Sequence, residues 1–119
     1  MVQGLLTEDT LRTNSDAQIR ATRVLSRSVF GGAAYRLEIG AAIADTGGIA
    51  NASELADTLG ISRQSVTAEL QVLERAGLVG PPDRSGRKAY RLAHPSGYWA
   101  LCRKWRDSAP EMLRRNPLF

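Results

Sequence analysis

The sequence contains few of the residues that build metal and redox sites. Its 119 residues include one cysteine and one histidine. A structural zinc site needs about four nitrogen, sulfur or oxygen ligands, and a catalytic one about three. With a single cysteine, Cys102, the chain has no internal disulfide, as is usual in a reducing compartment. We therefore expect no metal site and no cofactor.

Long apolar segments are also absent. No apolar run approaches the roughly 18 to 20 residues of a membrane-spanning helix. The opening MVQGLLTEDT has neither the basic start nor the long apolar stretch of a signal peptide. We therefore expect a cytoplasmic protein without a membrane partner.

Catalytic patterns are missing as well. There is no glycine-rich phosphate-binding loop ending in Gly-Lys-Ser/Thr. One histidine and one cysteine give little support for a nucleophile–base pair. The sequence therefore predicts that the protein is not an enzyme.

Charge is distributed unevenly along the chain. Residues 1–61 carry five basic and seven acidic side chains, whereas residues 62–119 carry eleven basic and five acidic ones. The net charge of +4 is thus a balance of −2 in the first part and +6 in the second. A concentrated basic region suits a polyanionic partner such as nucleic acid.

Apolar residues recur at helical spacing in several segments separated by glycines. We expect helices over residues 16–30, 33–45, 52–59, 63–76 and 98–107, with a short strand at Ile49-Ala50. Ala109-Pro110 should interrupt the last helix. The corresponding division is a flexible N-terminal segment (1–15), one domain (16–108) and a C-terminal tail (109–119).

The centre of the chain has the signals of two helices joined by a tight turn. Asn51 and Ser62 are good N-terminal caps, and Gly60 can adopt the left-handed conformation that the turn requires. In the second helix, Val66 and Leu70 begin an apolar stripe that continues to Leu73. This order predicts a helix-turn-helix motif.

A basic hairpin is expected after the second helix. Leu78-Val79 is its predicted first strand, residues 81–86 its turn and residues 89–92 its return strand. The predicted fold class is therefore mainly α with a small β-hairpin (α+β): a winged helix-turn-helix with flanking helices.

The polar side of helix 63–76 has the chemistry needed to read a major groove. Arginine pairs with guanine, glutamine pairs with adenine, and a threonine methyl contacts the thymine methyl. The alternative is an ordinary solvated helix face. The candidate DNA-contacting residues are Ser62, Arg63, Gln64, Ser65, Thr67 and Gln71 in the helix, and Arg84, Arg87 and Lys88 in the hairpin.

Residues 62–79, SRQSVTAELQVLERAGLV, resemble the recognition helix and following strand of repressors of the arsenic-repressor-like (ArsR) family. The multiple-antibiotic-resistance-regulator (MarR) family is a similar neighbour. Residues 52–62 and 35–39 resemble the preceding parts of the ArsR motif. The resemblance implies a sequence-specific regulator of double-stranded DNA, usually a repressor, that forms a homodimer through helices 16–30 and 98–107.

Four matters stay open. Many relatives carry serine, arginine and histidine where this chain has Thr67-Ala68-Glu69, and Glu69 either accepts from cytosine or lies outside the groove. Cys102, beside Arg103, is either a redox switch or a small buried core residue. No pattern identifies a small-molecule effector. The alternative function is a protein-interaction or assembly module without specific DNA binding.

Overall fold

The computed structural model describes residues 8–46, 49–80, 89–91 and 97–115. These ranges contain five helices and two three-residue strands. The helices are α1 (Glu8–Val29), α2 (Arg36–Asp45), α3 (Ala52–Leu59), α4 (Arg63–Arg75) and α5 (Gly97–Arg115), and the strands are β1 (Ile49–Asn51) and β2 (Ala89–Arg91).

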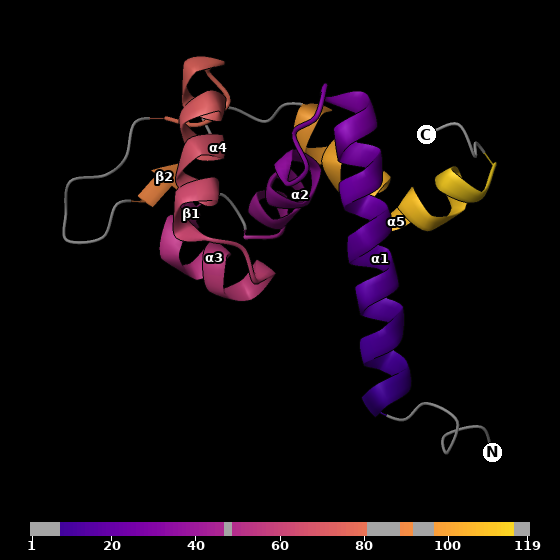
Figure 1. Ribbon diagram of the computed structural model, residues 1–119. Helices are drawn as coiled ribbons and strands as arrows, with labels where there is room; N and C mark the ends of the chain where they lie inside the picture. The colour runs from indigo at the N-terminus through magenta and orange to yellow at the C-terminus, as the bar shows by residue number, and fades with distance from the viewer. Residues whose placement is uncertain (1–7, 47–48, 81–88, 92–96, 116–119) are drawn as a thin grey trace.

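Helix α2 is the centre of the molecule. It packs against α1 and α5 on one side and against α3 and α4 on the other. Figure 1 shows the resulting arrangement: α3, α4 and the strands form one end, whereas α1 and α5 form the other. The N-terminal half of α1 extends beyond the other helices in this view.

Two clusters of buried apolar side chains correspond to these two ends. We call the first the α3–α4 core: Ile39, Ile43, Ala52, Leu55, Ala56, Ile61, Val66, Leu70, Leu73, Val79 and Trp99. We call the second the α1–α5 core: Leu25, Leu37, Ala41, Cys102 and Ala109. Both contain residues of α2, so this short helix joins the two ends through its opposite faces.

The predicted β-hairpin after α4 is wrong, because it is not seen in the described residues. In the described residues Leu78-Val79 forms no strand, and β2 instead runs antiparallel to β1, with Ala50 opposite Tyr90. The amides of Leu78 and Val79 both donate to the carbonyl of Leu73, at 2.9 and 3.4 Å, so the end of α4 uses them. The remaining residues assigned to the hairpin, 81–88 and 92, lie outside the described ranges.

The end of α4 explains why this segment turns back. Gly77 has a φ of 77°, in the left-handed region that glycine adopts readily. Its amide donates to the Glu74 carbonyl at 3.0 Å, while Leu78 donates to Leu73. These two bonds are those of a Schellman motif. The predicted stop at Gly77 is confirmed, and it directs Val79 into the α3–α4 core, where it is 1% exposed.

The predicted interruption of the last helix at Ala109-Pro110 is also wrong. Helix α5 continues through Pro110 to Arg115. A proline inside a helix leaves the carbonyl four residues earlier without its usual donor. Here that carbonyl belongs to Arg106, and the side-chain amide of Gln18 from α1 donates to it at 3.2 Å. A contact between distant segments thus supports a helix that its own sequence predicts to end.

The first helix likewise begins earlier than expected. It starts at Glu8 rather than at residue 16, so residues 8–15, predicted to be loosely structured, have a helical backbone. The apolar repeat used for the prediction begins only at Ala17. Periodicity detects the part of a helix that buries a stripe, and it misses polar turns that precede it.

Candidate nucleic-acid interface

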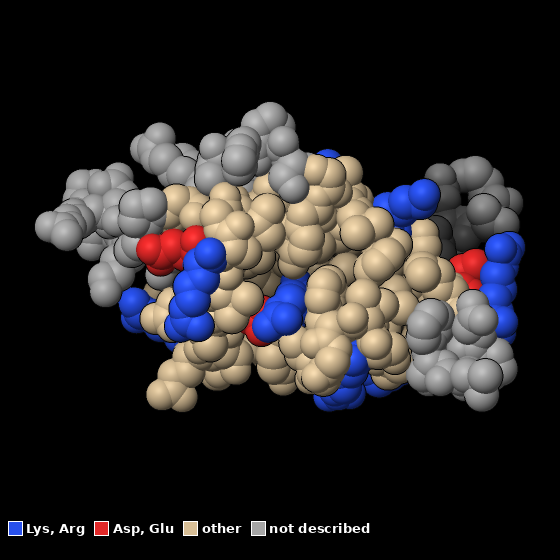
Figure 2. All heavy atoms as spheres, turned by 90° about the horizontal axis from the view of Figure 1, so that it is seen from above, with Lys and Arg blue, Asp and Glu red and all other residues tan. Residues whose placement is uncertain are grey.

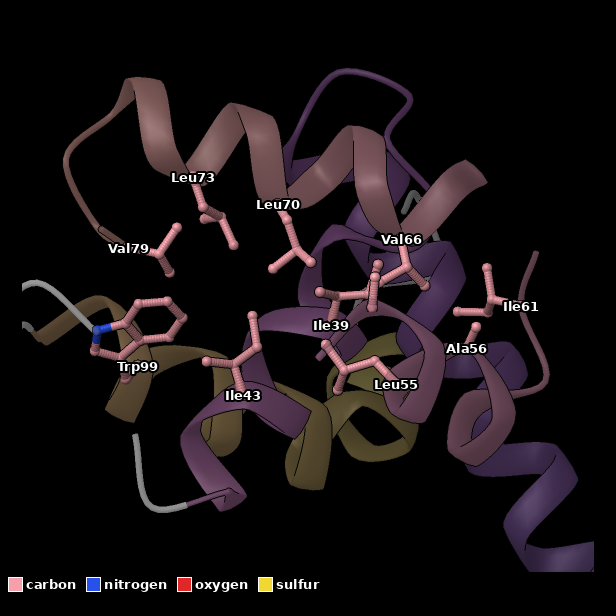
Figure 3. Close-up of a cluster of buried hydrophobic side chains, with 11 residues drawn as sticks. Ile39, Ile43, Leu55, Ala56, Ile61, Val66, Leu70, Leu73, Val79 and Trp99 are labelled. Atoms are coloured by element: carbon pink, nitrogen blue, oxygen red, sulfur yellow. The ribbon is translucent and has the colours of Figure 1, made fainter. Parts of the chain in front are cut away.

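Helix α4 is fixed to the molecule by its predicted apolar stripe. Val66 and Leu70 are 0% exposed and Leu73 is 3% exposed. Figure 3 shows all three pointing from α4 toward the buried side chains of α2 and α3. Because one face is held in the core, the opposite face of the helix is directed away from the protein.

The turn before α4 has the predicted geometry. Asn51 Oδ1 accepts from the amide of Glu54 at 3.1 Å and caps α3. Gly60 then adopts φ 67° and ψ 35°, and the following amide of Ile61 donates to the Ala56 carbonyl at 3.1 Å. Ile61 is 8% exposed and anchors the turn in the α3–α4 core. The helix-turn-helix predicted from the sequence is therefore present.

The two serines at the start of α4 are engaged with each other. Ser62 Oγ accepts from the Ser65 amide at 3.1 Å and lies 2.8 Å from Ser65 Oγ. Ser62 is thus the predicted N-cap, which satisfies one amide of the first helical turn. Ser62 is exposed and Ser65 is half-buried.

The outer face of α4 gathers most of the predicted reading residues. Ser62, Arg63, Gln64 and Gln71 are exposed, and Thr67 is half-buried. A shallow hollow of about 320 Å³ lies on this face, which we call the α4 hollow. It is lined by Arg63, Gln64, Thr67, Ala68 and Gln71.

Glu69, by contrast, is directed to another helix. Its carboxylate forms a two-point ion pair with Arg36 of α2, with Nε–Oε2 at 2.8 Å and Nη2–Oε1 at 3.4 Å. The pKa of Arg36 is raised above its ordinary value. The hydrogen bond to Glu69 is the largest cause, and burial acts in the opposite direction. The Arg36 guanidinium also lies 5.7 Å from the centre of the Phe30 ring. These contacts favour the alternative in which Glu69 is outside the groove.

On the face seen in Figure 2, basic side chains lie at several places, and acidic side chains border some of them. Arg63 is the arginine at the start of α4, and the exposed Arg75 is in its last turn. The other predicted cations, Arg84, Arg87 and Lys88, lie outside the described residues. Attraction of phosphates by those three therefore stays a prediction.

Cys102 is a component of the α1–α5 core. It is 1% exposed, and burial raises the pKa of its thiol to about 11. A side chain at Gly40 would place its Cβ 2.6 Å from Cys102 Sγ, so α2 and α5 are in close contact here. Near neutral pH the thiol is protonated, and a protonated thiol is not the nucleophile. This favours the interpretation of Cys102 as a small core residue.

Sequence reasoning missed a second polar site between α1 and α2. Glu38 is 4% exposed, and its carboxylate binds Arg23 with Nε–Oε1 at 2.6 Å and Nη2–Oε2 at 3.4 Å. Burial raises the pKa of Glu38, and the hydrogen bond from Arg23 opposes the increase. The signal in the sequence is a single acidic residue within the apolar run LEIGAAIA.

Glu38 borders a hollow of about 380 Å³ that also involves α3 and α5. Its lining residues are Gln18, Ile19, Thr22, Glu38, Leu59, Arg106 and Asp107. Among the described residues, no three histidine, cysteine, aspartate or glutamate side chains come together as a metal site. His94, the one histidine of the sequence, lies outside the described ranges.

Residues 41–88 match the family model described as MarR family. The matched segment is less than half of the chain and contains α3, the turn at Gly60 and α4. It supports a DNA-binding helix-turn-helix regulator of transcription. The matching model is that of the MarR family, to which the sequence was expected to be similar only as a neighbour of the ArsR family. The resemblance to the ArsR family is not confirmed.

No curated protein and no solved structure matches the chain. Within the described part of the chain, no helix has both the length and the apolar character needed to span a membrane.

Proposed function

We propose that this protein regulates transcription by binding specific sites in double-stranded DNA, with α4 lying in the major groove. One observation carries the proposal. The stripe Val66, Leu70 and Leu73 is buried, while Arg63, Gln64 and Gln71 are exposed on the opposite side of the helix. Arginine and glutamine are side chains that pair with base edges in the major groove. The family-model match over residues 41–88 supports the same function.

Binding as a homodimer is part of the proposal. Among the side chains of α1 that the structure describes, three apolar ones are exposed by more than a third: Ile19 at 37%, Val24 at 36% and Val29 at 39%. Leu101 on α5 is 38% exposed. These residues lie in the two segments expected to pair, 16–30 and 98–107. A dimer presents two copies of α4, so its site on DNA is a pseudo-palindrome with half-sites one helical turn apart, or a multiple of it.

The proposed outcome of binding is repression, which the resemblance to repressor families implies. The basic residues Arg84, Arg87 and Lys88 complete the proposed interface by contacting the DNA backbone or the minor groove. Their contribution is electrostatic, so it does not depend on the base sequence.

The direct test is the selection of bound duplexes from a random pool by the intact protein. A pseudo-palindromic consensus supports the proposal, and its half-site spacing gives the geometry of the dimer. Recovery of no consensus, together with no binding to random duplex at low salt, contradicts it. In that case a protein-interaction module, the alternative function, becomes the better description.

Variants then separate base reading from general attraction. Replacing both Arg63 and Gln64 by alanine should weaken binding to the selected site by at least about tenfold, because one bidentate base contact gives about 1–3 kcal/mol of discrimination. Binding to random duplex should change far less. Arg75→Ala is a matched control, since Arg75 is an exposed arginine at the other end of α4. Equal losses on both duplexes would contradict base reading.

The basic segment has its own test. Replacing Arg87 and Lys88 by alanine should weaken binding to every duplex and lower the slope of log affinity against log salt by about one for each phosphate that the protein no longer neutralises. Gel shifts between about 50 and 200 mM salt measure that slope over a range in which affinity changes strongly. An unchanged slope would remove these two residues from the interface.

Sedimentation velocity tests the dimer. Val24→Asp places a charge on the exposed apolar part of α1 without entering the core, so the protein should stay folded and become monomeric. Asp16→Asn, a change at another exposed residue of α1, is the control that should leave the dimer intact. A wild-type protein that sediments as a monomer at micromolar concentration contradicts the proposed dimer.

A further inference from the structure

The α4 hollow differs in kind from the rest of the outer face. Two of its lining side chains, Thr67 and Ala68, are short, and the other three, Arg63, Gln64 and Gln71, are long. On a helix, residues three and four positions apart are neighbours on one face. Gln64, Thr67 or Ala68, and Gln71 therefore follow one another along α4, with the short side chains between the two amides.

A hollow of this kind has one natural apolar counterpart in the major groove. Among the groups that the bases present there, the C5-methyl of thymine is apolar, and alanine and the threonine methyl are its usual contacts. Ala68 is exposed and Thr67 is half-buried, so both reach the surface on which a groove would rest. A longer side chain at either position would fill the space that the methyl group needs.

The two glutamines frame this hollow at a useful distance. They are seven residues apart, which is about 10.5 Å along a helix at 1.5 Å per residue. That length corresponds to about three base pairs at 3.4 Å each. Glutamine pairs bidentately with adenine N6 and N7. The spacing therefore allows Gln64 and Gln71 to contact adenines within about three base pairs of each other. A thymine methyl would then lie against the short side chains between the two glutamines.

The ion pair of Glu69 removes one candidate acceptor for cytosine. Recognition of cytosine N4 requires an acceptor such as a glutamate carboxylate. Both carboxylate oxygens of Glu69 are bound to Arg36, and the Glu69 side chain is only 15% exposed. Glu69 is also absent from the lining of the hollow. Among the described residues, the lining of the hollow thus includes no acidic acceptor for cytosine, and Arg63 is at its N-terminal edge.

We infer that the α4 hollow reads a thymine C5-methyl through Thr67 and Ala68, and that Gln64 and Gln71 read adenines on either side. The half-site is therefore rich in A·T pairs at the three or so positions under the centre of α4. This inference rests on the proposed function, because it specifies the bases that the same helix face would recognise.

The test uses the duplex selected by the intact protein and removes single methyl groups from it. Each thymine of the half-site is replaced in turn by 2′-deoxyuridine, which keeps the base-pairing edge and lacks the C5-methyl. One position should show a loss of about fourfold in affinity, the equivalent of about 0.8 kcal/mol for one buried methyl group. Thymines outside the half-site are the control and should show no loss.

Protein variants identify the side chains that contact the methyl group. Thr67→Ser removes one methyl and keeps the hydroxyl, so it should weaken binding to the thymine duplex and be nearly silent on the deoxyuridine duplex. Ala68→Leu fills the hollow and should reduce affinity by about tenfold or more. Ala76→Leu is its matched control, because Ala76 is an exposed alanine at the far end of the same helix. The ratio of the two affinities within each variant removes any effect of altered stability.

The outcomes distinguish a failure of the methyl-reading inference from a failure of the proposed function. A selected half-site with a G·C-rich centre, or a deoxyuridine series without any loss, overturns the methyl-reading inference. If the Arg63 and Gln64 variant still weakens specific binding, the regulator itself stands. Failure to select any duplex removes the proposed function and the inference with it.

Discussion

The two ends of the molecule are stabilised in different ways. The α3–α4 end is held by an apolar core and by local caps, such as Asn51 on α3 and Ser62 on α4. The α1–α5 end also contains buried polar groups, because Thr22, Ser26 and Glu38 are at most 4% exposed. Their partners include residues distant in sequence. Local signals thus describe the first end well, whereas contacts between helices decide the second.

The largest expected effect tests whether these ends form one cooperative unit. Leu70 in the α3–α4 core and Leu25 in the α1–α5 core are each 0% exposed. Leu70→Ala and Leu25→Ala should each reduce the free energy of unfolding by about 2–5 kcal/mol, through reduced apolar burial and the cavity that remains. Urea denaturation followed by circular dichroism measures both.

Because α2 contributes to both cores, each variant should unfold in one transition. Two separate transitions, with only one of them shifted in each variant, would show that the ends are independent domains. The two ends would then be two structures joined by α2 rather than one.

The second effect concerns the buried ion pair of the α1–α5 end. Arg23→Ala leaves the Glu38 carboxylate without its partner in a site where that side chain is 5% exposed. Loss of one member of a buried pair costs about 3–5 kcal/mol. We expect about 3 kcal/mol at pH 7, near the lower limit, because Arg23 is 27% exposed. Adding Glu38→Gln to this variant should recover part of the loss, since no charge is then stranded.

The pH dependence of stability shows independently whether burial or the ion pair with Arg23 dominates at Glu38. The pKa of Glu38 is raised above its ordinary value of 4.5, with burial as the largest cause. The folded state therefore holds this proton more tightly than the unfolded chain does. The resulting stabilisation is complete below pH 4.5 and is lost as the pH rises through the raised pKa.

Relative to Glu38→Gln, the wild-type protein should accordingly lose stability as the pH rises above 4.5, the ordinary pKa of this carboxyl. Unfolding free energies of both proteins across this range measure the difference. A difference that grows in favour of the wild type as the pH rises would show that Arg23 outweighs burial and that the pKa is lowered.

These two ends also explain what the sequence could predict. The caps at Asn51 and Ser62, the glycine turn at Gly60 and the stripe on α4 each depend on residues within one or two turns of one another. The predictions made from them are confirmed. The outward position of Gln64 and Gln71 follows from the same periodicity, so the exposed face of α4 could be predicted from the sequence. Its contact with DNA stays a prediction.

The errors at Pro110 and Leu78 concern hydrogen-bond partners that the local apolar pattern does not identify. Pro110 was expected to interrupt the helix. The side-chain amide of Gln18 that donates to the Arg106 carbonyl is 88 residues away in the sequence, so the local pattern does not reveal it. Leu78 was assigned to a strand because the sequence does not reveal that the Leu73 carbonyl at the end of α4 accepts from its amide. The pair of Glu69 with Arg36, across 33 residues, was likewise not readable from the local pattern. Hydrophobic periodicity shows which face of a helix is apolar, but it does not identify the element or side chain that contacts each face.

A smaller effect is expected from one buried hydroxyl that fixes the connection between α1 and α2. Ser26 Oγ donates to the Ala33 carbonyl at 2.5 Å and accepts from the Leu37 amide at 3.1 Å. Ser26→Ala should destabilise the protein by about 1–3 kcal/mol, since two polar backbone groups lose a partner. Ser28→Ala is the matched control, because Ser28 is exposed and bonds only within its own helix.

Thermal unfolding monitored by calorimetry compares the two serine variants. A similar small change in both would mean that water replaces the hydroxyl of Ser26 at no cost. The polar contacts of the α1–α5 end would then be less important than their burial suggests.

The smallest effect isolates a single hydrogen bond between α1 and α5. Gln18→Ala removes the donor to the Arg106 carbonyl and should cost about 0.5–1.5 kcal/mol, the usual net contribution of one such bond. In a Pro110→Ala background the amide of residue 110 becomes available to that carbonyl within α5. Gln18→Ala should then cost much less. A double-mutant cycle in urea measures the coupling between these positions. Equal costs in the two backgrounds would show that Gln18 stabilises the contact of α1 with α5 by packing alone. A helix that continues through its proline would then need another explanation than the borrowed donor.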